Sequence, residues 1–176
     1  MIGKSKVIDI VIPVYNEGEN ILRVLNAFDE QVKNPIRVLI CYDFDEDSTL
    51  PSVTSFSSNK FEVVPVKNKG KYAHGAAITG FNFSSAPAVI SYMADDDYNA
   101  EKIDLMIEKF LHGCDVVCAS RFMPGGKMVG CRWQKAWLVR AAAFSLKYFA
   151  NLPTHDPTNA FHLFSRRLLQ KAKIES

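Results

Sequence analysis

The sequence predicts an α/β fold with a mainly parallel sheet flanked by helices, and three observations support this prediction. Short apolar stretches rich in β-branched residues alternate with stretches of helical spacing along the chain. The predicted strands are apolar throughout, which is typical of parallel strands covered on both faces. Polar residues follow several of these strands, and parallel sheets bind their ligands beyond the carboxyl ends of the strands.

The predicted elements follow one another in a regular order. The expected strands cover residues 7–14, 36–42, 61–66, 88–93, 115–119 and 161–165. Asn20 is the expected cap of the first helix, and Asp47 opens the second. The third helix is expected from about Gly75 to Phe83 and the fourth over residues 101–112. A further helix is expected within residues 127–151 and a short one after residue 165.

Length and composition favour a single soluble domain over residues 1–176. The net charge of +2 gives no reason to expect a nucleic acid as partner. The 4 cysteines lack zinc-like spacing, so we expect small buried hydrophobic residues in a reducing compartment. No apolar run approaches the ~20 residues of a membrane span. The chain is therefore expected to be soluble, or to touch a membrane from one side only.

Three consecutive aspartates, Asp95 to Asp97, follow the predicted fourth strand. They could form a solvated turn or cap the next helix, since carboxylates are favoured at helix N-termini. At the end of a buried strand, however, such crowding destabilises the fold unless a cation neutralises it. Oxygen ligands suit Mg²⁺ or Mn²⁺. We therefore expect Asp95 and Asp97 to bind the metal.

Two common nucleotide-binding patterns are missing from the sequence. It contains no GxxxxGK[ST] phosphate loop, and no GxGxxG follows the first predicted strand. A P-loop enzyme or a dinucleotide-dependent dehydrogenase is therefore not expected.

Several motifs together resemble a known family. They are IPVYNE at residues 12–17, residues 43–49, residues 68–81, MADDD at residues 93–97, residues 119–126 and residues 156–161. In this order the chain resembles glycosyltransferase family 2, and within it the dolichol-phosphate mannosyltransferases and bacterial polyprenyl-phosphate glycosyltransferases. The resemblance implies a GT-A type fold and a nucleotide-sugar donor.

The resemblance also implies roles for individual residues. Pro13, Tyr15 and Glu17 match positions that line the nucleotide pocket, and Asp43 matches a residue that contacts the base. Lys69 and Gly70 match the loop near the nucleotide, and Asp96 is expected in the same pocket. Arg121 matches a position beside the diphosphate, and Asp156 matches the rim of the active site. The expected catalytic residues are Asp95, Asp97, Arg121 and Asp156.

The acidic motif fits the family in two registers. The usual pattern is Asp-x-Asp, and alignment on Glu101 places Met93 at the first aspartate, with Asp95 second and Asp97 one ligand position later. In the other register, residues 95–97 are themselves the Asp-x-Asp. Asp95 is retained in both.

The segment from Lys127 to Asn151 mixes basic and aromatic residues. Such a helix suits a bilayer surface and a phosphate headgroup, although it could instead cover the sheet with long basic side chains extended to solvent. The resemblance favours the first alternative. Arg132, Lys135 and Arg140 are then expected to bind the acceptor phosphate.

These expectations combine into one main hypothesis. The chain is an inverting enzyme that moves a hexose from a GDP- or UDP-sugar to a polyprenyl phosphate at the cytoplasmic face of a membrane. A lipid phosphate is already ionised and needs no general base. Two alternatives are a transferase acting on a saccharide or glycolipid, with Asp156 as base, and a non-catalytic nucleotide-sugar-binding domain. Family members usually continue beyond this point, so the chain is expected to be truncated at its C-terminus.

Overall fold

A computed structural model gives the fold and describes residues 7–123, 126, 132–152 and 154–172. The chain forms two compact units. The first, called unit 1, comprises residues 1–117 and 163–176, and the second, called unit 2, comprises residues 118–162.

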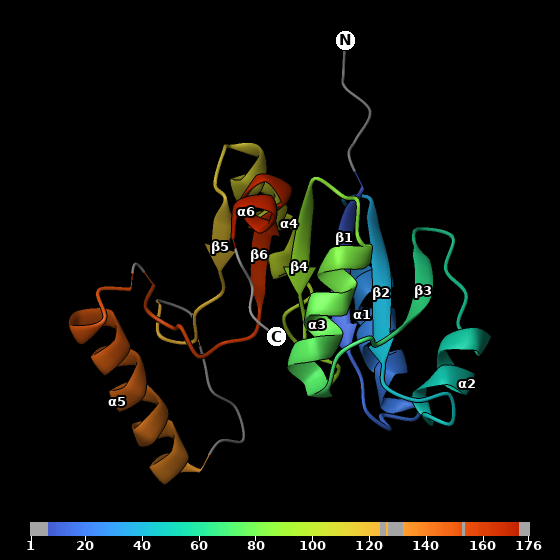
Figure 1. Ribbon diagram of the computed structural model, residues 1–176, viewed down its shortest axis with the longest axis horizontal. Coiled ribbons are helices and arrows are strands. Elements are labelled where there is room, and N and C mark those ends of the chain that lie inside the picture. Colours follow the sequence, from blue (N-terminus) through green and yellow to red (C-terminus); the bar gives the residue numbers. More distant parts are fainter. Residues whose placement is uncertain (1–6, 124–125, 127–131, 153, 173–176) are drawn as a thin grey trace. The chain divides into compact units, whose positions relative to one another are not determined.

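A six-stranded sheet has the order β3-β2-β1-β4-β6-β5 (Figure 1). Its strands are β1 Ile8–Pro13, β2 Ile36–Tyr42, β3 Glu62–Lys67, β4 Ala88–Ser91, β5 Val116–Cys118 and β6 His162–Ser165. β1 pairs in parallel with both β2 and β4, and β2 pairs in parallel with β3. The predicted α/β fold with a mainly parallel sheet is confirmed.

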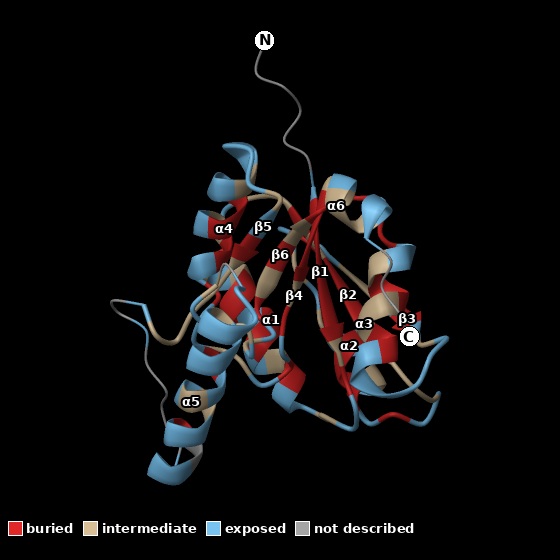
Figure 2. Ribbon diagram, turned by 60° about the vertical axis from the view of Figure 1, so that its left-hand side comes forward, coloured by how far each residue is buried: buried red, intermediate tan, exposed pale blue. Residues whose placement is uncertain are grey.

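Helices cover both faces of the sheet in unit 1. The helices of the chain are α1 Asn20–Gln31, α2 Thr49–Ser55, α3 Tyr72–Phe83, α4 Lys102–Leu111, α5 Trp133–Phe149 and α6 Arg166–Lys171. α3 lies on one face and α1 on the other (Figure 1). Buried residues are concentrated on the strands, as Figure 2 shows. Phe28 of α1 packs edge-on against Tyr92 at 5.0 Å between ring centroids.

Three sequence expectations differ from the structure in detail. Asn20 is not the helix cap, because α1 already begins there and Glu19 precedes it without a side-chain capping bond. α3 begins at Tyr72, three residues before the expected start. β4 ends at Ser91, so the aspartates do not follow the strand directly. The chain turns after the strand, and the Asp96 N–H donates to the carbonyl of Met93 at 3.4 Å.

The segment after β6 completes unit 1. Arg166 donates from its guanidinium to the carbonyl oxygens of Phe81 and Ala86 and to Ser84 Oγ, at 2.7 to 3.1 Å. Its backbone N–H also donates to the carbonyl of Pro87 at 2.8 Å. Arg166 therefore satisfies the carbonyl of Phe81, in the last turn of α3 where carbonyls lack intrahelical partners, and further acceptors in the turn after the helix.

Gly80 allows α3 to approach the sheet closely. A Cβ at this position would lie 2.5 Å from Val11 Cγ1 and 2.8 Å from Cys41 Sγ. We expect Gly80→Ala to lower the free energy of unfolding by about 1–3 kcal/mol, because overpacking forces neighbouring atoms to move. Circular dichroism during urea unfolding measures this change. The double variant Val11→Ala with Gly80→Ala should recover part of the loss, and no recovery would contradict the overpacking.

Candidate functional site

The loops after β1 and β2 are tied together by a buried carboxylate. Asp47 accepts hydrogen bonds from the backbone N–H groups of Asn16 at 3.1 Å and Thr49 at 2.8 Å. Asn16 Oδ1 accepts from the Ser48 N–H at 3.2 Å, and the Glu17 N–H donates to Thr49 Oγ1 at 3.0 Å. Asn16 has a φ of 54°, a left-handed conformation that asparagine tolerates. This network holds the Tyr15–Glu17 loop in one position.

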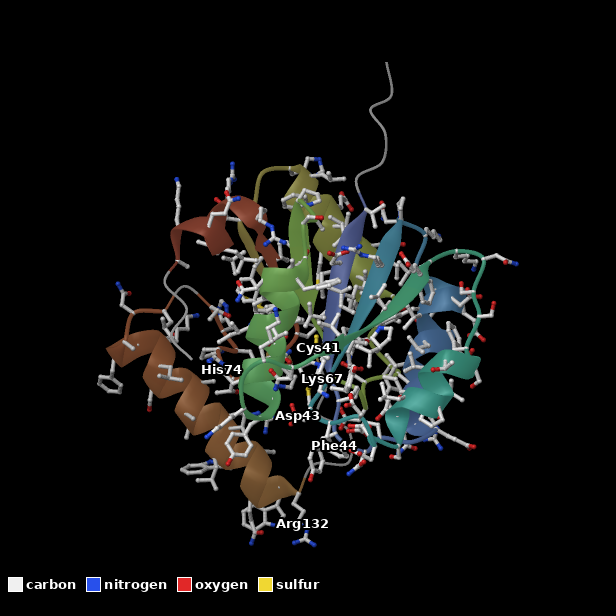
Figure 3. All side chains as sticks on the ribbon, turned by 45° about the vertical axis from the view of Figure 1, so that its right-hand side comes forward. Cys41, Asp43, Phe44, Lys67, His74 and Arg132 are labelled. Carbon is white, nitrogen blue, oxygen red and sulfur yellow. The ribbon has the colours of Figure 1, made fainter. Side chains whose placement is uncertain are left out.

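Two aromatic side chains lie next to this network. Tyr15 contacts Phe44 edge-on, with 5.6 Å between ring centroids, and the Tyr15 side chain is 66% exposed. Pro13 ends β1 and pairs with Cys41 of β2. Figure 3 shows Cys41, Asp43 and Phe44 following one another at the carboxyl end of β2. The residues expected in the nucleotide pocket after β1 and β2 therefore come together at one edge of the sheet.

Asn68 links the loop after β2 to the loop after β3. Its Nδ2 donates to Asp43 Oδ1 at 2.6 Å, and its Oδ1 accepts from the Gly70 N–H at 2.7 Å and from Thr79 Oγ1 at 3.0 Å. The Lys69 N–H donates to Thr79 Oγ1 at 3.1 Å. Sequence reasoning named Asp43, Lys69 and Gly70 but missed Asn68 and Thr79 as members of this site. The position of Asn68 directly after a strand was the available signal for it, while Thr79 gave none.

The three aspartates have different surroundings. Asp96 Oδ1 accepts from the backbone N–H groups of Tyr98 and Asn99, each at 3.2 Å, and both Asp96 oxygens accept from Asn99 Nδ2. Asp96 therefore holds the turn. Asp95 is exposed and Asp97 half-buried, which leaves these two carboxylates accessible to a cation.

Negative charge gathers between the loop after β1 and the acidic segment. Burial raises the pKa of Glu17, and the charges of Asp95 and Asp47 raise it further. Burial likewise raises the pKa of Tyr92, with added effects from Asp96 and Asp97. Like charges in one region favour binding of a cation.

The accessible carboxylates of Asp95 and Asp97 fit a cation that is also bound by the phosphates of a substrate. Among the described residues, no three His, Cys, Asp or Glu side chains come together as a metal site. Mg²⁺ in nucleotide enzymes typically uses one or two carboxylates together with substrate phosphates and water. Asp95 and Asp97 supply that number of carboxylates.

Unit 2 contains a partly buried ion pair between two of the residues expected to be catalytic. The fully buried Asp156 accepts from Arg121 N at 3.0 Å, from Nε at 2.7 Å and from Nη2 at 2.7 Å. Thr158 Oγ1 also donates to Asp156 at 3.1 Å. Burial raises the pKa of Asp156, but the hydrogen bonds and charge of Arg121 outweigh it, so the net pKa is lowered. This carboxylate is saturated with donors and is a weak proton acceptor.

A cavity of about 450 Å³ lies within unit 2. Basic and aromatic groups line it, among them Arg121, Arg140, Lys147, Phe144 and Tyr148. The structure thus combines positive charge with an apolar wall, which suits an anionic group attached to an apolar chain.

The residues expected to bind the acceptor phosphate differ in whether they line this cavity. Arg140 lines the cavity, whereas Arg132 is exposed at the start of α5 and is not among the lining residues. The side chain of Lys135 lies outside the described residues. The predicted helix in this segment is confirmed as α5. Over the part of the chain that the structure describes, no helix combines the length and apolar character needed to cross a membrane.

Comparison with solved structures identifies the fold. Glucosyl-3-phosphoglycerate synthase from Mycobacterium tuberculosis, solved with Mn²⁺, UDP and glucosyl-3-phosphoglycerate, superposes with a TM-score of 0.65 at 16% identity. The match covers 93% of this chain and 58% of that one. The predicted GT-A type fold is therefore confirmed.

Curated relatives are similar at low identity. Polyprenol monophosphomannose synthase of Mycolicibacterium smegmatis is 22% identical over 95% of this chain and 64% of its own length. Dolichol-phosphate mannosyltransferase of Pyrococcus furiosus is 29% identical over 69% of this chain and 35% of its own length. The chain thus spans less than two thirds of each of these relatives.

The sequence profile described as glycosyl transferase family 2 matches residues 9–172. This range includes all of β1 except its first residue, the Asp43 and Asn68 loops, the acidic segment and the Arg121–Asp156 pair. The chain belongs to glycosyl transferase family 2.

Proposed function

We propose that the chain transfers a hexose from a nucleoside diphosphate sugar to a polyprenyl phosphate, with inversion, using Mg²⁺ or Mn²⁺. The observation that carries this proposal is the network that joins the loops after β1, β2 and β3 around Asp47 and Asn68. It brings Asp43, Glu17 and an exposed aromatic ring to the carboxyl edge of the sheet, where such folds bind nucleotides. The similarity to polyprenol and dolichol phosphate mannose synthases supports the acceptor class.

The reaction would exchange one carbon–oxygen bond for another. An oxygen of the lipid phosphate attacks the anomeric carbon, and the bond from that carbon to the diphosphate breaks. The nucleoside diphosphate leaves with the bonding electrons from the opposite face. Asp95 and Asp97 would hold the cation, which when bound neutralises charge on the diphosphate.

The acceptor needs no base in this reaction, because a phosphate is already an anion at neutral pH. The surroundings of Asp156 agree with this, since its oxygens are occupied by Arg121 and Thr158. They do not favour the alternative of a saccharide acceptor that Asp156 would deprotonate.

The surface of α5 supports a membrane-bound acceptor. Trp133, Trp137, Phe144 and Tyr148 are all exposed and recur at spacings that place them on one side of the helix. Aromatic residues beside Arg140 and Lys147 suit the interface of an anionic bilayer. In this proposal, unit 2 touches the cytoplasmic face of a membrane peripherally.

A two-stage experiment tests the function. We expect a UDP- or GDP-hexose with Mn²⁺ to stabilise the chain in a thermal-shift panel, by about 2.7 kcal/mol at a ligand concentration of 100 times Kd. The stabilising donor, radiolabelled in the sugar, should then label polyprenyl phosphate. Phosphoglyceric acid and free saccharides serve as comparison acceptors. Stabilisation without any labelled product would favour a binding domain, and product only on a saccharide would favour the other transferase.

A further inference from the structure

The described residues around the cavity in unit 2 do not neutralise its positive charge. Arg121, Arg140 and Lys147 line the cavity, and its described lining includes no Asp or Glu. Arg121 is already paired with Asp156 at 2.7 Å. For Arg140 and Lys147, no carboxylate of the described residues lies within ion-pair distance. Two positive charges are therefore available to an anionic ligand.

These two charges stand on one face of α5. Arg140 and Lys147 are seven residues apart, which is two helical turns and about 10 Å along the helix axis. Ala143 lies between them on the same face, where it is buried and lines the cavity. Its side chain is only a methyl group, so it does not fill the gap between the two cations. Because arginine and lysine side chains are long, both reach a ligand that sits over Ala143.

An apolar wall lies next to this gap. The rings of Phe144 and Tyr148 pack with 4.4 Å between their centroids, and Lys147 Nζ lies 5.5 Å from the centroid of the Tyr148 ring. Phe122 and Met123 also line the cavity. A phosphate held over Ala143 would therefore have apolar side chains beside it, and these suit a hydrocarbon chain attached to that phosphate.

Phosphate esters differ in how they would meet the two cations. A phosphate monoester has three terminal oxygens and carries close to two negative charges near neutral pH. The planar guanidinium of Arg140 can bind two of these oxygens as a fork, and the ammonium of Lys147 can bind the third. A phosphodiester has only two terminal oxygens and one negative charge, so one of the two cations stays without a partner. Lys147 is half-buried, and a charge left unpaired in such a place weakens binding.

We propose that Arg140 and Lys147, on either side of Ala143, select a phosphate monoester over a phosphodiester. Unit 2 would thereby distinguish the terminal phosphate of a polyprenyl phosphate from the phosphodiester groups of bulk membrane lipids. This inference rests on the proposed function, because it assumes that the acceptor phosphate enters this cavity. Lys147, which the sequence did not single out, then binds the acceptor, while Arg121 holds Asp156.

Calorimetry on the full chain tests the selection, with farnesyl phosphate, its methyl phosphodiester and inorganic phosphate as probes. His155 also lines the cavity, so all probes are compared at the same pH, about 8, where the monoester is a dianion. We expect farnesyl phosphate to bind at least about tenfold more tightly than either of the other two. Equal affinity of the two esters would overturn the selection by charge. Inorganic phosphate that bound as tightly as farnesyl phosphate would overturn the assignment of the cavity to a lipid phosphate.

A membrane lipid gives a second comparison. Phosphatidylglycerol is a phosphodiester, so in mixed micelles an equal amount of it should leave farnesyl phosphate bound. Displacement of farnesyl phosphate by phosphatidylglycerol would mean that the cavity binds bulk lipid headgroups, and it would overturn the inference.

The Lys147→Gln variant gives a sharper readout. Its affinity for farnesyl phosphate should fall about tenfold, whereas its affinity for the methyl phosphodiester should stay within about twofold, because Arg140 still binds two oxygens. Arg140→Gln is a second variant that should also lower the ratio of the two affinities. Lys109→Gln is the matched control, because Lys109 is exposed on α4 in unit 1, and its ratio should not change. An equal loss of both esters in the two cavity variants would contradict selection between them.

Sugar transfer separates this inference from the proposed function. Transfer to polyprenyl phosphate by a chain that binds both esters equally would overturn the inference alone. Transfer to no polyprenyl phosphate would overturn the proposed function itself.

Discussion

Replacing Asp95 with asparagine should reduce sugar transfer by about a hundredfold or more, because the variant loses a negatively charged oxygen ligand to the cation. Asp95 is exposed and lies close enough to Glu17 to raise the pKa of that side chain. The fold should be unaffected, since no structural hydrogen bond from the described residues depends on the Asp95 side chain. Transfer of radiolabelled sugar across a range of Mn²⁺ concentrations measures the effect.

The neighbouring aspartates should differ in their effect on transfer. Asp97→Asn should also cause a large loss, whereas Asp96→Asn should cause a smaller one, because an amide oxygen can still accept the turn hydrogen bonds from Tyr98 and Asn99. Glu108→Gln removes one charge from the surface of α4 and serves as the control. If the Asp95→Asn variant transferred sugar at the unaltered rate, the assignment of Asp95 as a metal ligand would be wrong.

Replacing Asp156 with alanine should destabilise unit 2 by about 2–4 kcal/mol, somewhat less than for a fully buried ion pair, because the Arg121 side chain that remains is 30% exposed to water. Thr158→Val is a matched control that removes two hydrogen bonds, one from Arg121 and one to Asp156, and should cost about 1–3 kcal/mol. The chain has 2 tryptophans, and both Trp133 and Trp137 lie in unit 2. Tryptophan fluorescence during urea unfolding therefore reports on the unit that the substitution affects.

The same pair should make unit 2 sensitive to acid. The pKa of Asp156 in the folded chain lies below its ordinary value of 3.8, so the stabilising effect is fully present above that value. It is lost as the pH falls through the folded pKa, since the unfolded chain binds the proton first. The Asp156→Ala variant should lose less stability than the unaltered chain as the pH falls below 3.8. A variant that kept its stability and changed only the pH profile of turnover would assign Asp156 to the chemistry instead.

Much of the fold could be predicted because local signals agreed with tertiary packing. Two apolar stretches, which form β1 and β2, were predicted as buried strands. The observed strands lie within one residue of the expected bounds. The prediction that Asn20 caps α1 was wrong. Asparagine is a common cap residue, but the helix starts at Asn20 without using its side chain. The end of β4 was misplaced because Tyr92 and Met93 have strand-forming character, while the turn that stops the strand depends on Asp96.

Most residues at the polar edge of the site were predicted, but the hydrogen bonds that connect them were not. The rule that ligands bind after parallel strands singled out Tyr15, Asp43 and the aspartates. Thr79 could not be found this way, because it lies inside a helix and reaches the Asn68 loop only once α3 packs against the sheet. The saturation of Asp156 by Arg121 was equally hidden, since the two residues are far apart in the sequence and read as separate catalytic groups.

The strand order has a consequence for how the chain is made on the ribosome. β5 joins the sheet only through β6, since β6 lies between β5 and β4. In the sequence, almost all of unit 2 lies between β5 and β6. At synthesis rates of about 5–20 residues per second, β5 would wait several seconds for its neighbour. Arg166, which closes the end of α3, arrives later still. Unit 1 is thus translated early but completed late, and in that interval the exposed edge of β4 is a place where a chaperone could bind the nascent chain.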